Sequence, residues 1–269
     1  MLTPMLLPGL MAAGVGSLVF TGMGWLTGLS SSACAITSLT LSPLAAPTLA
    51  DFGWTIVLAL VAAVVVLTII EIGRWIYRLV EGRPFVVIPV AALLVGGLVV
   101  VFAKITGEPA NLVLFSGQEA MGSVVNLAAG LSLTTLALLV LFKGLAWGIS
   151  LGSARGGPTF PAIFLGIVGG LMAGHLPGFA QTPAVAVLVG VGCVAVLRLP
   201  PSSVVRAVLV THAGLAVTPL VIVGVVIAYV AIVWLSSLRT TGSSGAGESG
   251  ADNAGRATRA MGTQRMPES

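Results

Sequence analysis

The sequence has few charged residues and almost no cysteine. Asp, Glu, Lys and Arg make up 7% of the 269 residues, whereas 57% are hydrophobic, and a soluble domain carries roughly 25% charged residues. Residues 1–50 contain no charged side chain at all. Cys34 and Cys193 are the only cysteines, which excludes a disulfide framework and a cysteine-rich metal site. This composition excludes a soluble fold and predicts a membrane protein.

The sequence also lacks the motifs of common enzymes. It contains no HExxH, no GxSxG, no P-loop and no closely paired carboxylates. We therefore expect no catalytic activity, no cofactor and no bound metal. The net charge of +4 is small, and a modest basic excess in a membrane protein is typical of cytoplasmic loops. Nucleic acid is consequently not an expected partner.

Long apolar stretches predict a multi-pass protein of a plasma or inner membrane. A bilayer core of about 30 Å needs about 20 apolar residues of helix. Stretches of sufficient length lie at 5–29, 52–80, 84–104, 131–150 and 216–237. Because basic residues resist translocation, the turn at 81–84 and the nearby Arg74 and Arg78 are predicted to be cytoplasmic. Residues 105–130 are then expected on the opposite side.

Glycine and proline divide the second half of the sequence into shorter pieces. The chain holds 35 Gly and 15 Pro, and after Gly152 the apolar pieces 158–175, 183–197 and 201–212 each fall short of a full span. Broken helices are tolerated at membrane depth only where protein or a water-filled cavity surrounds them, as in ion pathways and transporters. We therefore predict that the functional site lies in this half.

The composition changes sharply near residue 237. Residues 238–269 are rich in Ser, Gly, Thr and Ala and contain no aromatic residue. Such a segment cannot bury a core. The predicted organisation is a transmembrane domain at 1–237 followed by a disordered polar tail at 238–269.

A glycine-rich turn precedes the first of the short pieces. Pro158, after Gly156 and Gly157, has a preset φ suited to a first helical turn, so a helix is predicted to begin here. The unpaired amides and the dipole of a helix start attract an anion without a full charge that would hold it too tightly.

A second interpretation of the same glycines is structural. Small residues about four apart let helices approach closely, and glycines occur at 166, 169, 170 and 174. The turn at 156–158 would then only redirect the chain. Both interpretations remain open at this point.

Three motifs carry a resemblance to a known family. The stretch Gly156-Gly157-Pro158-Thr159-Phe160-Pro161 resembles the Gly-Gly-x-Phe-x-Pro segment of the CLC family of chloride channels and proton-coupled chloride transporters. Leu197-Arg198-Leu199-Pro200-Pro201 is similar to the family's Arg-Ala-Pro-Leu-Thr turn, and Val217-Thr218-Pro219-Leu220 to the Leu-Pro start of its last long helix. The resemblance covers roughly 1–237 and implies an all-α fold with broken and re-entrant helices, equivalent to the second inverted repeat of a CLC subunit.

This resemblance implies chloride conduction or exchange. The candidate anion-binding residues are Gly156, Gly157, Thr159 and Phe160, through the amides of the last two and the Thr159 hydroxyl. Arg155, beside the turn, is a candidate vestibule residue. The implied partners are chloride or a similar small anion, the lipid bilayer and a second copy of the chain in a homodimer.

The sequence departs from the family in ways that limit the expectation. The family's first repeat contributes a Gly-Ser-Gly-x-Pro loop and a Gly-x-Glu-Gly-Pro loop that bears the gating glutamate, and neither occurs here. Thr159 stands where the family usually has Phe, and no pore tyrosine follows Trp234. We therefore expect half of a pore, which needs a separately encoded N-terminal half. The alternatives are a non-conducting truncated subunit and an unrelated solute permease.

Four further ionisable residues lie in or near apolar stretches. Lys143 falls in the middle of a predicted span, and we expect its long side chain to extend its ammonium to the interface rather than to attract anions. Arg206 needs a partner, water or the interface. His175 and His212 are predicted at helix ends.

Overall fold

The computed structural model describes residues 3–27, 39, 41, 42, 44, 46–118, 120–127, 130–154 and 156–237, and the regular elements in these ranges are all helices. They are α1 (Thr3–Thr27), α2 (Leu49–Gly82), α3 (Pro84–Thr106), the 3₁₀ helix η2 (Ala110–Leu112), α4 (Ala120–Leu127), α5 (Leu133–Ser153), α6 (Thr159–Ala173), α7 (Gln181–Leu197), α8 (Pro200–Thr211) and a last helix, Thr218–Ser237. Within these described ranges, α2, α3, α5 and the last helix are long and apolar enough to cross a membrane. The predicted all-α membrane-protein class is thus confirmed.

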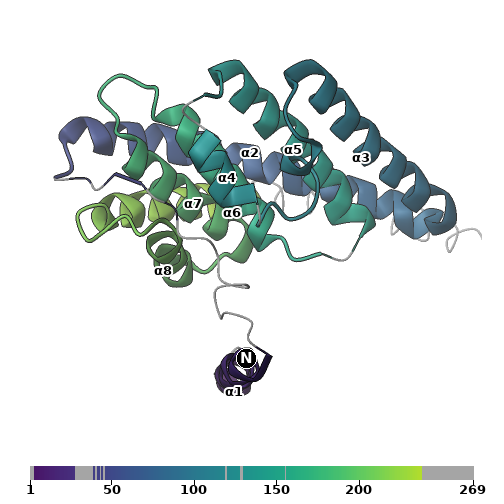
Figure 1. Ribbon diagram of the computed structural model, residues 1–269, viewed down its shortest axis with the longest axis horizontal. Coiled ribbons are helices and arrows are strands. Elements are labelled where there is room, and N and C mark those ends of the chain that lie inside the picture. Colours follow the sequence, from purple (N-terminus) through teal and green to yellow (C-terminus); the bar gives the residue numbers. More distant parts are fainter. Residues whose placement is uncertain are drawn as a thin grey trace, which may run out of the picture.

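These four helices agree with the predicted spans at 52–80, 84–104, 131–150 and 216–237. The first predicted span, 5–29, is helical in α1, whose described side chains at 8–23 are all exposed. In Figure 1, α1 lies apart from the other helices. The predicted tail at 238–269 lies outside the described residues.

Local sequence explains where α2 begins. The Thr48 hydroxyl accepts a hydrogen bond from the Asp51 amide at 3.3 Å, and the Asp51 carboxylate accepts from the Thr48 amide at 2.8 Å. This reciprocal capping box satisfies two amides that a helix start leaves unpaired. The 34 residues of α2 measure about 51 Å, so the helix is longer than a bilayer core of about 30 Å.

The short pieces predicted in the second half are short helices. α6, α7 and α8 contain 15, 17 and 12 residues, which corresponds to about 22, 26 and 18 Å of helix. Each is shorter than the bilayer core of about 30 Å. α6 makes its most extensive contact with α7, and α7 also packs against α2 and α8 (Figure 1). The short helical pieces predicted from the proline pattern are confirmed.

Glycines allow α6 to pack directly on the backbone of α7. A Cβ added at Gly166 would lie 2.7 Å from the carbonyl oxygen of Leu188, and one at Gly170 or Gly174 would also meet the α7 backbone at 3.0 Å or less. Gly169 differs, because a Cβ there would make an ordinary contact at 3.4 Å with the Leu188 side chain. The structural interpretation of Gly166, Gly170 and Gly174 is therefore confirmed.

The α2–α5 interface sets the direction of the chain before the glycine turn. Gly144 of α5 faces Ile69 of α2, and Gly152 faces Gly73 so closely that a Cβ would overlap the Gly73 carbonyl oxygen. The two helices therefore run in the same direction. As a result, the turn that follows α5 lies at the same end of the molecule as the C-terminus of α2.

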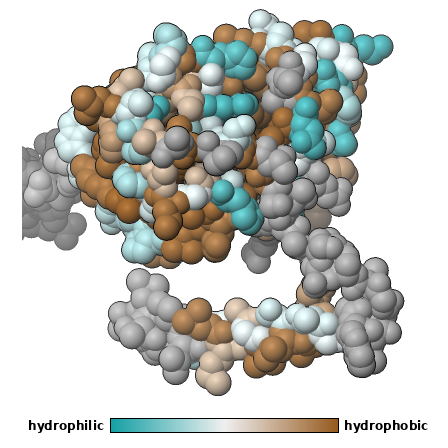
Figure 2. All heavy atoms as spheres, turned by 60° about the vertical axis from the view of Figure 1, so that its left-hand side comes forward, coloured by the Kyte–Doolittle hydropathy of each residue, from teal (hydrophilic) through white to brown (hydrophobic). Residues whose placement is uncertain are grey.

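The outer surface of the helical body is largely apolar. Large exposed hydrophobic side chains follow α2, α3 and the last helix, among them Leu60, Val61, Leu93, Leu94, Val226 and Val230. Figure 2 shows hydrophobic residues over much of the visible face of the body, interspersed with hydrophilic ones, many of them towards its upper part. An apolar surface of this extent is expected where a protein meets lipid.

Candidate anion site

A cavity of about 260 Å³ follows one face of α5 down to the glycine turn. We call it the α5 cavity, and its lining residues are Val95, Val113, Leu114, Phe115, Ser116, Lys143, Ala146, Trp147, Ser150, Leu151, Ala154, Gly156, Gly157 and Pro161. The α5 residues among them recur every three or four positions, as one helix face requires. From Lys143 to Ala154 the helix rises about 16 Å, so the cavity extends over about half of a bilayer core.

The glycine turn forms the open end of the α5 cavity. Gly156 and Gly157 are exposed, and a Cβ added at either would meet no atom within 4 Å. Neither has a positive φ. These two glycines are therefore required neither by close packing nor by an unusual backbone, and they leave free space where the cavity opens.

The start of α6 adjoins this opening. Thr159 is the first residue of α6 and Pro158 is its N-cap, so the predicted start of a helix at this turn is confirmed. No side chain caps this helix. The N-termini of α2 and α5 are capped by Thr48 and Ser132. α7 and α8 also lack side-chain caps, but they contribute no residue to the α5 cavity.

The structure brings together only part of the predicted site. Gly156 and Gly157 line the cavity, whereas Thr159 and Phe160 are half-buried and stand just beyond it, next to Pro161, which does line it. The first-turn amides of Thr159 and Phe160 have no partner within the helix. Arg155, the predicted vestibule residue, lies outside the described residues.

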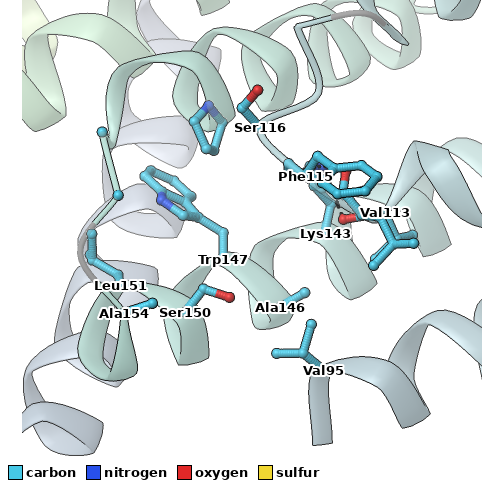
Figure 3. Close-up of a pocket in the computed structure, with 14 residues that line it drawn as sticks. Val95, Val113, Phe115, Ser116, Lys143, Ala146, Trp147, Ser150, Leu151 and Ala154 are labelled. Carbon is cyan, nitrogen blue, oxygen red and sulfur yellow. Dashed lines mark hydrogen bonds between the residues drawn. The ribbon is translucent and has the colours of Figure 1, made fainter. Parts of the chain in front are cut away.

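Lys143 lines the α5 cavity away from the glycine turn. Its side chain is 1% exposed, and its Nζ donates hydrogen bonds to the carbonyl oxygens of Val113 at 3.0 Å, Leu114 at 2.9 Å and Phe115 at 2.9 Å. Figure 3 shows the side chain directed at this segment. The expectation that Lys143 extends to the interface is therefore wrong. The chain after α3 folds back beside α5 and supplies acceptors that the sequence pattern did not reveal.

The hydrogen bonds match the donor set of the charged form of Lys143. An ammonium has three N–H donors, one for each of the three carbonyl oxygens, whereas a neutral amine has two. The ammonium also lies 4.9 Å from the centre of the Phe164 ring on α6, within the range of a cation–π interaction. Among the described residues, no acidic side chain pairs with it. The cavity therefore contains a positive charge that the described carboxylates do not neutralise.

The backbone that accepts these hydrogen bonds is strained at Phe115. This residue has a φ of 56°, a left-handed conformation that costs a non-glycine residue about 1–2 kcal/mol. The hydrogen bond from Lys143 to its carbonyl oxygen helps to hold it there. The same segment provides Ser116, which lines the cavity with Trp147 and Ser150 of α5 (Figure 3).

His175, Arg206 and His212 do not line the α5 cavity. His175 follows α6 and His212 is the C-cap of α8, so both stand at helix ends as predicted. Arg206 is exposed on α8. In the part of the chain that the structure describes, no group of His, Cys, Asp and Glu side chains could hold a metal ion.

A larger groove of about 410 Å³ lies among α2, α5, α6 and α7. Its lining residues are Leu, Val, Ala, Met and Gly throughout. It offers no side-chain donor for an ion and is suited to apolar contact. The α5 cavity, with its ammonium, serines and indole, is the better candidate for a polar ligand.

Comparisons of the chain with protein families, with curated proteins and with solved structures found no match.

Proposed function

We propose that this chain forms one wall of a membrane pathway for chloride or a similar small anion, in a CLC-like architecture. The observation that carries the proposal is the α5 cavity, which has the glycine turn and the start of α6 at one end and the buried ammonium of Lys143 at the other. Among the described residues, no acidic side chain lines it. The resemblance of residues 156–161 to the CLC motif supports the same proposal.

The electrostatics of this arrangement favour weak anion binding. A helix start carries about half a positive charge together with unpaired amides, and Lys143, whose Nζ lies 4.9 Å from the Phe164 ring of α6, adds a full charge farther along the cavity. The walls between them are mostly apolar, apart from Ser116, Trp147 and Ser150. An anion would shed part of its hydration at either end and would not be held tightly, as conduction requires.

The proposal includes a facing wall from another polypeptide. The α5 cavity extends over about 16 Å, whereas a pathway must cross a bilayer core of about 30 Å. The CLC resemblance implies that each pore needs two repeats of one subunit, so a homodimer of this chain alone does not complete it. We expect liposomes with the purified chain to release chloride no faster than empty ones, and a complementary first-half polypeptide to raise the rate.

Gly157→Asp tests whether an anion enters the cavity. The new side chain meets no neighbouring atom at its Cβ, and a carboxylate about 4–8 Å from an anion disfavours it by about 2–4 kcal/mol at an effective dielectric constant of about 20. Chloride binding to the purified chain in lipid nanodiscs, followed by chlorine NMR line broadening, should fall by about thirtyfold or more.

Gly157→Asn is the matched control, because it adds a side chain of the same size without the charge. It should weaken binding only by the several-fold that a narrower opening explains, far less than Gly157→Asp, and both variants should keep the wild-type circular dichroism spectrum. Equal chloride binding by wild type and Gly157→Asp would remove the glycine turn from any anion pathway.

A further inference from the structure

Lys143 fills a site whose chemistry suits a cation. Three consecutive carbonyl oxygens, from Val113, Leu114 and Phe115, converge on one point at 2.9–3.0 Å from the lysine Nζ. Convergent backbone carbonyls are the groups with which channels replace the hydration shell of a monovalent cation. Here the position is taken by an ammonium that is covalently part of α5.

The Lys143 ammonium and the three carbonyl groups lie in the wall of the α5 cavity, where they can act on an ion inside it. Lys143 and the three carbonyl-bearing residues all line that cavity. With the ammonium in place, this part of the cavity wall carries a positive charge. Without it, three carbonyl oxygens would present the negative ends of their dipoles to the same space.

We propose that Lys143 is the charge-selectivity residue of the α5 cavity: its tethered ammonium occupies a carbonyl cage that would otherwise take a monovalent cation, and it thereby makes the cavity selective for anions. This inference rests on the anion pathway proposed above and identifies the residue that sets its preference for the sign of charge. Its hydrogen bonds also fix the strained segment at Phe115. The Lys143 side chain therefore determines both the backbone conformation of this part of the cavity wall and its electrostatic potential.

The decisive variants change the charge at position 143 in two ways. Lys143→Met removes the charge and keeps a long apolar side chain, whereas Lys143→Arg keeps the charge. Lys104→Met is the matched control, because Lys104 is an exposed lysine near the end of α3 that does not line the cavity. Each full-length protein is prepared in lipid nanodiscs, and its helix content is checked by circular dichroism.

Two probes are measured on each protein. Chloride binding is followed by chlorine NMR, and monovalent-cation binding by thallium NMR with Tl⁺ as a potassium substitute. A unit charge within the cavity changes the affinity for an ion by about ten- to thirtyfold at an effective dielectric constant of about 20. We expect Lys143→Met to lose chloride affinity by that factor and to gain saturable Tl⁺ binding, while Lys143→Arg and Lys104→Met stay close to wild type.

A separate substitution tests the same idea without touching Lys143 or its hydrogen bonds. Ser116→Asp adds a carboxylate to the cavity wall, and Ser116→Asn is its neutral counterpart. If Lys143 acts through its charge, Ser116→Asp should weaken chloride binding by about tenfold or more and Ser116→Asn should not. This pair keeps the proposal testable if Lys143→Met does not fold.

The outcomes separate this inference from the proposed function. Absence of chloride binding by the wild-type chain would count against the anion pathway itself, and Tl⁺ binding gained by Lys143→Met would still show that the ammonium blocks a cation cage. Wild-type chloride affinity in folded Lys143→Met or in Ser116→Asp would overturn the selectivity role. Lack of Tl⁺ binding in folded Lys143→Met would overturn the cage.

Discussion

The two ends of the glycine-rich segment 156–174 use the same residue type for opposite purposes. Gly166 and Gly170 lie in the body of α6, where an added methyl group would run into the α7 backbone. Gly156 and Gly157 lie before the helix, where an added methyl group would touch nothing. In the helix, glycine removes volume so that two backbones can meet. In the turn, it leaves volume empty.

This contrast connects the packing of α6 with the cavity. Because the body of α6 is held against α7, the first turn of the helix is fixed next to the open end of the α5 cavity. The close packing of α6 on α7 thus positions the glycine turn, whose own glycines have no close neighbours. Substitutions along α6 and on a lipid-facing helix can test whether stability and anion binding separate in this way.

The largest effect on stability is expected for Gly170→Ala. The new Cβ would overlap the backbone at Val185, which cannot move without separating α6 from α7. Overpacking a close interface typically costs about 1–3 kcal/mol, and more where backbone blocks relaxation. Thermal unfolding of the detergent-solubilised protein should show a marked loss of stability. Gly169→Ala, one residue away but with an ordinary contact, is the control, and an equal loss in both variants would contradict the packing argument.

A smaller and different effect is expected for Gly157→Ala. The methyl group meets no protein atom, so the unfolding temperature should stay close to wild type. It narrows the opening of the α5 cavity, and chloride affinity should fall by about two- to fivefold, equivalent to up to about 1 kcal/mol. Chloride titration by NMR measures this change. A loss of stability with unchanged chloride binding would show that Gly157 is needed for packing and not for space in the cavity.

The smallest effect is expected for Gly97→Ala on α3. Gly97 is exposed and its added Cβ would meet nothing within 4 Å. Replacing glycine by alanine inside a helix stabilises it by about 0.5–1 kcal/mol. The unfolding temperature should rise slightly and chloride binding should not change. A clear loss of stability would indicate that this face of α3 packs against protein rather than lipid.

Much of the helical framework followed directly from the sequence. Apolar length predicted α2, α3, α5 and the last helix, and proline spacing predicted the short helices α6, α7 and α8. The start of α6 near Pro158 was also predicted, because proline suits a first turn and glycine precedes it. These features depend on local properties of the chain, which a sequence displays directly.

Lys143 shows where local reasoning failed. A single lysine in an apolar stretch can avoid an unpaired buried charge in two ways. Its ammonium can reach the membrane interface, or it can bind hydrogen-bond acceptors in the protein interior. The acceptors are carbonyl oxygens about thirty positions earlier in the chain. Backbone carbonyls have no signature in the sequence, because every residue has one. The buried position could be recognised only once the fold was known.

The sequence by itself determined that the chain is an all-helical membrane protein, where its long helices run and where α6 begins, because hydrophobic length and proline geometry act over neighbouring residues. The tertiary structure alone decided which glycines meet backbone and which border open space. It also decided that residues 113–115 return to enclose Lys143. These outcomes depend on contacts between segments distant along the chain, and such contacts are fixed only when all the helices pack together.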